Sequence, residues 1–144
     1  MHYKDLSKYT YMSFLNDKRI PNDSLNVGWL EKSVPYTKGN VENESFIEKI
    51  FEIVFCEEKI HLTRGFQPCT FCNNFDEKLG VELPIVINWN DKKLKLGSGI
   101  LVIENEGKRY VFPDLIIHYI SAHDYLPPKE FIDAVMKYKI KAIK

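Results

Sequence analysis

The stretch Pro68-Cys69-Thr70-Phe71-Cys72 is the part of the sequence that decides how we expect this chain to fold. Two cysteines with two residues between them can both reach one metal ion from a tight turn of the backbone. Two histidines further along the chain can supply the remaining donors of a tetrahedral site. The pattern therefore predicts a Zn²⁺ site whose ligands are Cys69, Cys72, His118 and His123.

The spacing of the two histidines constrains the local structure around them. On an ideal helix, positions five apart differ by about 140° around the axis, so His118 and His123 can face one ion only if the helix ends or tightens between them. Tyr125-Leu126-Pro127-Pro128 follows directly and favours such an end. The 45 residues between Cys72 and His118 far exceed the spacing of a zinc finger. We therefore predict the two-cysteine, two-histidine ligand set of a zinc finger without the finger's DNA-binding module.

Other assignments of these residues stay open at this point. Cys56 or His61 could replace one of the histidines as a ligand. Asp114 lies one helical turn before His118 and could orient its imidazole. His118 could equally be a histidine packed in the core, and the cysteine pair could be small buried side chains without a metal.

Composition limits the classes of partner and compartment. Lys and Arg total 20 and so do Asp and Glu, so no net charge attracts nucleic acid or an anionic membrane. The hydrophobic fraction of 44% is typical of a globular chain. No run of about eighteen apolar residues and no signal-peptide pattern is visible. Three cysteines, two of them in C-x-x-C, suit a reducing compartment, so we expect a cytoplasmic protein that does not bind membranes or nucleic acid.

Hydrophobic periodicity predicts three helices. Apolar residues recur at spacings of three and four over 44–57, which indicates a helix with one broad apolar face. A second helix is expected over 113–123, opening at Pro113, and a third over 128–138.

Three strands are expected between the cysteines and the second helix: Leu83–Trp89, Leu94–Ile103 and Arg109–Phe112. Turn sequences separate them, which favours an antiparallel meander, and Gly97-Ser98-Gly99 suggests a bulge in the second strand. Residues 1–42 mix aromatic residues with chain breakers and indicate an irregular segment. The fold class predicted is a single α+β domain over 1–144, with zinc joining the cysteine turn to the second helix.

The sequence partly matches motifs of two enzyme classes. Cys56-Glu57-Glu58 before Pro68–Cys72 is similar to the pattern of zinc deaminases, but there both parts open helices, whereas Cys56 ends one. A thioredoxin-like role for C-x-x-C requires a helix after the first cysteine, and Asn73-Asn74-Phe75-Asp76 is a poor helix start.

Five groups of residues carry a resemblance to a known family. Arg64-Gly65-Phe66-Gln67-Pro68-Cys69-Thr70-Phe71-Cys72 is followed by Leu96–Gly99 and by His118-Tyr119-Ile120-Ser121-Ala122-His123-Asp124-Tyr125-Leu126-Pro127-Pro128. Together with Tyr3–Ser7 and Asn26–Leu30, this order resembles a family of small uncharacterised bacterial proteins, a domain of unknown function. The resemblance spans most of the chain and implies that the cysteine and histidine pairs belong to one site. The chain departs from the family at Gln67, where relatives tend to have histidine, and in a longer segment over 73–95.

A site with four protein ligands has no position left for substrate or activated water, so the ligand set favours a scaffold over a catalyst. We therefore expect a non-enzymatic protein that binds a macromolecular partner, and in its most specific form an immunity protein for a bacterial toxin. A zinc enzyme with an open metal position, or a C-x-x-C redox protein, is the alternative.

Overall fold

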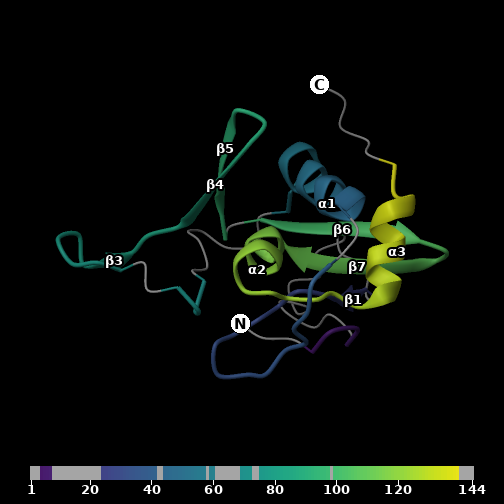
Figure 1. Cartoon of the computed structure of the whole chain (residues 1–144), viewed down its shortest axis with the longest axis horizontal. Coiled ribbons are helices and arrows are strands. Elements are labelled where there is room, and N and C mark those ends of the chain that lie inside the picture. The colour runs from purple at the N-terminus through teal and green to yellow at the C-terminus, as the bar shows by residue number, and fades with distance from the viewer. Residues whose placement is uncertain are drawn as a thin grey trace.

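The structure is a computed structural model that describes residues 4–7, 24–41, 44–57, 59–60, 69–72, 75–97 and 99–139. Within these ranges the chain forms three helices and seven strands, which are labelled in Figure 1. In chain order they are β1 (Leu25–Asn26), α1 (Glu44–Cys56), β2 (Phe75–Asp76), β3 (Val81–Glu82), β4 (Ile85–Trp89), β5 (Lys92–Leu96), β6 (Ile100–Asn105), β7 (Lys108–Pro113), α2 (Ile116–Ala122) and α3 (Lys129–Lys137). The α+β class predicted from the sequence is confirmed.

The main sheet has three strands in the order β1-β7-β6. β6 and β7 form an antiparallel hairpin, with Ile100 opposite Pro113. β1 lies parallel to β7, with Leu25 opposite Tyr110. A parallel neighbour needs a long crossover, and most of the chain lies between these two strands. The sheet is therefore mixed, where a purely antiparallel meander was expected.

The expected strand Leu94–Ile103 is divided between β5 and β6. Gly97 has a φ of 110°, which favours glycine. Its amide donates a hydrogen bond of 2.7 Å to Asp114 Oδ1, and the amide of Gly99 donates to Oδ2 at 3.3 Å. Because these two amides bind a side chain instead of a neighbouring strand, the sheet is interrupted between β5 and β6.

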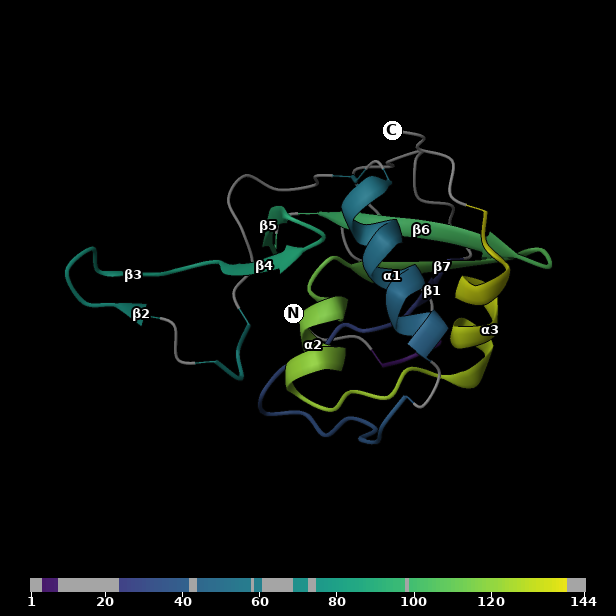
Figure 2. The same cartoon turned by 45° about the horizontal axis from the view of Figure 1, so that its top comes forward.

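β4 and β5 consequently form a separate two-stranded sheet, with Trp89 opposite Lys92. β2 and β3 form another short antiparallel hairpin. Figures 1 and 2 show the two hairpins extending from one side of the body, and we call residues 75–96 the hairpin arm.

The helices and the main sheet share the core. α1 agrees with the helix expected over 44–57, and Figure 2 shows it crossing in front of β6 and β7 beside α3. Phe131 of α3 is fully buried, and its ring centroid lies 6.5 Å from that of Phe46 and 5.2 Å from that of Phe112. Among the described residues, no helix is long and apolar enough to cross a membrane.

The second helix begins later than the sequence suggested. Pro113 is the last residue of β7, and α2 starts at Ile116. The amide of Asp114 donates to the carbonyl of Gly99 at 3.0 Å, which continues the hairpin pairing one residue past Pro113. A proline at the end of a strand removes no required donor, so it closes the strand here and does not open the helix.

Asp114 connects this turn to the rest of the body. Its carboxylate lies 3.3 Å from Lys59 Nζ, and the two side chains are 0% and 11% exposed. Burial raises the pKa of Asp114 and lowers that of Lys59, and their mutual attraction opposes both shifts. Three donors, the amides of Gly97 and Gly99 and the ammonium group of Lys59, thus surround the Asp114 carboxylate at the start of the segment that carries His118.

Candidate metal centre

The two cysteines lie in a short turn. The amide of Cys72 donates to the carbonyl of Cys69 at 3.3 Å, so both thiols leave the same turn of backbone. Thr70 Oγ1 accepts a hydrogen bond of 2.8 Å from the amide of Lys32, which attaches the turn to the N-terminal part of the chain. Cys69 is buried in the hydrophobic core cluster. Gly65 and Pro68, which precede the turn in the sequence, lie outside the described residues.

The two histidines come from the end of α2. His118 lies within the helix, and His123 is its C-cap, with φ of −123° and ψ of 17°. The amide of His123 donates to the carbonyl of Tyr119 at 3.0 Å. The helix therefore ends at His123, where the backbone leaves the helical conformation, and both imidazoles can face one point.

Four donor atoms converge where the turn meets the helix, and all of them lie within 4.8 Å of one another. His118 Nε2 lies 3.2 Å from His123 Nε2 and 3.3 Å from Cys72 Sγ. His123 Nε2 lies 3.4 Å from both Cys69 Sγ and Cys72 Sγ. The residues predicted from the sequence, Cys69, Cys72, His118 and His123, are thus brought together.

These distances agree with the edges of a tetrahedron around zinc. With Zn–S near 2.3 Å and Zn–N near 2.0–2.1 Å, the N–N edge is about 3.3 Å and each S–N edge about 3.6 Å. The observed separations of 3.2 Å and 3.3–3.4 Å are shorter by only a few tenths of an ångström. Hydrogen bonds alone satisfy the arrangement poorly, because His123 Nε2 makes three short contacts and carries at most one proton or one lone pair. The donor set and its geometry fit a metal ion.

The surroundings of the cluster set the protonation states of its members. Burial, and secondarily the charge of His123, lowers the pKa of His118 to about 4. Burial also lowers the pKa of His123, against the opposing effect of Asp124. Both imidazoles are therefore neutral at pH 7, the form that ligates a metal.

The thiol of Cys69 needs a positive charge nearby to ionise. Burial raises its pKa to about 11, while hydrogen bonds from the backbone of Phe71 and Cys72 offset part of this effect. A divalent cation among these donors would supply the missing charge, and binding it would release the thiol proton.

Aromatic side chains that the sequence analysis did not assign to the site surround it. Phe71, between the two cysteines, packs edge-on against Tyr36 and Tyr119, with centroid distances of 5.3 and 6.0 Å. Its ring also lies 4.9 Å from the imidazole of His123. Tyr36 donates a hydrogen bond of 2.6 Å to the His123 carbonyl. The aromatic residue inside C-x-x-C was the signal that could have indicated this packing.

Three subsidiary expectations have different outcomes. Asp114 does not orient His118, because its oxygens accept from Gly97, Gly99 and Lys59 instead. Cys56 lies outside the four-residue cluster, at the end of α1. His61 lies outside the described residues.

The geometry also bears on the two enzyme patterns. Residues 69–72 form a turn and not the start of a helix, unlike the redox-active C-x-x-C of thioredoxin-like proteins. Cys56, the residue required for the deaminase pattern, is not among the converging donors.

Comparison with known proteins identifies the family. The model of a family described as Domain of unknown function (DUF7919) matches residues 1–136 of the 144 in the chain. The chain therefore belongs to this family. No curated protein and no solved structure matches it.

Proposed function

We propose that this family member holds a structural Zn²⁺ ion at Cys69, Cys72, His118 and His123, and that it is a non-enzymatic cytoplasmic protein that acts by binding a protein partner. The observation that carries the metal assignment is the convergence of two thiol and two imidazole donors within 4.8 Å. Sulfur and imidazole together favour zinc over the oxygen-seeking ions Mg²⁺ and Ca²⁺.

The ligand count supports a structural role. Four protein ligands complete the tetrahedral shell of zinc, whereas catalytic zinc sites have three and keep one position open. The ion would join the cysteine turn at 69–72 to the end of α2, two segments separated by 45 residues of sequence. The hairpin arm lies between them in the chain, so the ion would fix both ends of the segment from which the arm extends.

Elemental analysis of protein purified without chelator tests the metal assignment. We expect one zinc per chain, and Co²⁺ substitution should give the visible spectrum of a tetrahedral S₂N₂ site. Cys69→Ala and His118→Ala should lose the metal, while Cys56→Ala, which changes the cysteine outside the cluster, should keep it. Absence of metal in the wild type, or its loss in Cys56→Ala, would contradict the assignment.

The same variants separate a scaffold from an enzyme. If the ion is structural, His118→Ala should lower stability along with metal content. A variant that keeps its stability while losing a measurable reaction would favour the zinc enzyme.

The hairpin arm supports the partner-binding part of the proposal. Among the described residues, its exposed apolar side chains include Leu79, Val81 and Val86, which are 67%, 50% and 48% exposed. Exposed apolar side chains on a projecting element offer an apolar contact to a partner. The occupant we propose is a bacterial toxin neutralised by this protein.

The hypothesis that the partner is a toxin can be tested directly. A toxin gene should stand beside the gene for this chain, and the two purified proteins should form a complex. Leu79→Glu should weaken that complex, whereas Lys137→Glu, an exposed substitution on α3 away from the arm, should not. An adjacent toxin that fails to bind the purified protein would contradict it.

A further inference from the structure

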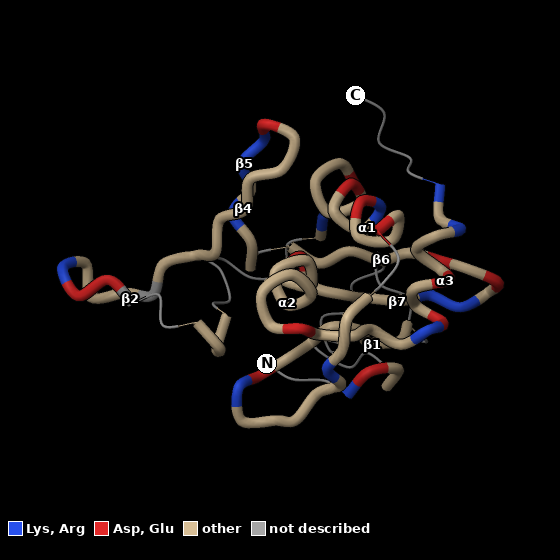
Figure 3. The backbone as a smooth tube through the Cα atoms, viewed as in Figure 1, with Lys and Arg blue, Asp and Glu red and all other residues tan. Residues whose placement is uncertain are grey.

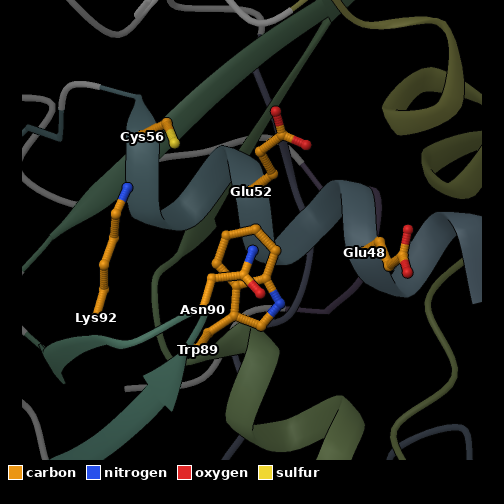
Figure 4. Close-up of a pocket in the computed structure, with 6 residues that line it drawn as sticks. All are labelled: Glu48, Glu52, Cys56, Trp89, Asn90 and Lys92. Atoms are coloured by element: carbon orange, nitrogen blue, oxygen red, sulfur yellow. The ribbon is translucent and has the colours of Figure 1, made fainter. Parts of the chain in front are cut away.

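A hollow lies between α1 and the β4–β5 hairpin, separate from the metal centre. It has a volume of about 430 Å³, within the range of pockets that hold small ligands. Its lining residues, drawn in Figure 4, are Glu48, Glu52, Cys56, Trp89, Asn90 and Lys92.

Trp89 forms the aromatic wall of this pocket, and side chains of α1 fix its position. The indole of Trp89 packs against Phe55 and Phe51 of α1, with centroid distances of 5.4 and 6.2 Å. Trp89 is only half-buried, so part of its ring remains free to contact a ligand. An indole face carries negative charge density and attracts cations.

Two carboxylates stand on the helical wall. Glu48 and Glu52 are four residues apart on α1, where like charges repel each other. The tube in Figure 3 shows the acidic positions of this helix in red. In the part of the chain that the structure describes, the ion pairs involve neither of these glutamates. A bound cation would relieve the repulsion between them.

The arrangement suits an organic cation better than a metal ion. Among the described residues, Cys69, Cys72, His118 and His123 are the one group of donors close enough to hold a metal, so Glu48 and Glu52 belong to no such cluster. A planar guanidinium stacks on an indole and donates several hydrogen bonds to carboxylates, and it loses less hydration than an ammonium.

Lys92 makes the two ends of the pocket differ in charge. In Figure 4 its ammonium group lies toward the Cys56 end of α1, away from Glu48. The lysine would repel a second positive charge on the ligand, so a single guanidinium on a neutral stem fits the pocket better than a polyamine does.

We propose that this pocket binds a guanidinium group, stacked on Trp89 and hydrogen-bonded to Glu48 and Glu52. The group could belong to an arginine side chain of a protein or to a small free guanidinium compound, since both present the same chemistry. The pocket residues lie on α1 and the β4–β5 hairpin and include none of the four metal-centre residues, so this proposal does not depend on the zinc assignment.

Fluorescence titration of the zinc-replete protein tests the proposal. Trp29 is 3% exposed and donates to the Val111 carbonyl, so a Trp29→Phe background leaves Trp89 as the reporter. The probes are N-acetyl-Gly-Arg-Gly-amide, the same peptide with citrulline in place of arginine, and ethylguanidinium. We expect saturable quenching by the arginine peptide or by ethylguanidinium, and binding of the citrulline peptide at least about fivefold weaker.

Variants identify the groups that bind. Glu48→Gln and Glu52→Gln should each weaken binding by about two- to fivefold, the range for exposed charge pairs. Glu44→Gln, one turn earlier on α1 and outside the pocket lining, is the matched control and should change nothing. For Trp89→Leu, calorimetry should show that the affinity for the arginine peptide falls by about two- to fivefold.

The outcomes separate the sources of the group. Tighter binding of the peptide than of ethylguanidinium assigns the pocket to a protein side chain, and equal binding assigns it to a free compound. Equal binding of the arginine and citrulline peptides, an equal loss in Glu44→Gln, or no saturable quenching would overturn the proposal. Zinc content, measured in every variant, reports separately on the metal centre.

Discussion

Removal of the metal should lower the thermal stability of this domain while leaving it folded. The hydrophobic core joins α1, α2, α3 and the main sheet, and of the four proposed ligands it includes Cys69 alone, so it should survive chelation. The proposed ion would add a cross-link between the cysteine turn and α2. The stabilisation should therefore be the size expected of a cross-link, and smaller than the entire folding energy that zinc supplies to a zinc finger.

The size of the effect follows from the length of the closed loop. Cys72 and His118 have 45 residues between them. The chain-entropy relation used for disulfides gives about 4 kcal/mol for a loop of this length. For a chain of 144 residues, each kcal/mol shifts the melting temperature by roughly 3–4 °C, so the metal-free protein should melt roughly 12–16 °C below the zinc-bound form.

Circular dichroism melting of zinc-bound, chelated and zinc-restored protein measures this difference. His123→Ala should melt like the chelated wild type whether or not zinc is present. Cys56→Ala is the control and should respond to chelation like the wild type. A chelation shift below about 3 °C, or complete unfolding on chelation at 25 °C, would refute the cross-link argument.

Two further predictions concern the residues that position α2. Asp114→Asn removes the charge facing buried Lys59 and should cost about 3 kcal/mol in urea unfolding, and adding Lys59→Met should restore part of the loss; no recovery in the double variant would contradict this. Gly28 has a φ of 77°, and a Cβ there would lie 2.8 Å from the Ile116 side chain, whereas Gly107, with a φ of 80°, has open space around it. Gly28→Ala should therefore destabilise by about 1–3 kcal/mol more than Gly107→Ala in the same assay, and equal losses would show that crowding against Ile116 is unimportant.

The convergence of the four candidate donor residues was predictable because ligand chemistry is local in sequence. A C-x-x-C can reach one ion from a single turn whatever the rest of the fold does, and the prolines after His123 signal the end of the helix that lets both imidazoles converge. The helices α1 and α3 were likewise visible, because each has one apolar stripe of helical period.

The interruption between β5 and β6 could not be predicted from local patterns. It depends on Asp114, a residue distant in sequence from Gly97, accepting hydrogen bonds from backbone amides that would otherwise extend a strand. The sequence suggested that Asp114 supports His118, since they are one helical turn apart. That inference was wrong because α2 begins after Asp114.

The sequence by itself therefore determined which side chains can bind a metal and which segments are helical, since both follow from residue type and short-range spacing. The tertiary structure decided the long-range contacts. These are the parallel pairing of β1 with β7, the hydrogen-bond partners of Asp114, and the pocket that Glu48, Glu52 and Trp89 line together. These depend on contacts between residues far apart in the chain, whose free energies are set by burial and geometry that no short stretch of sequence contains.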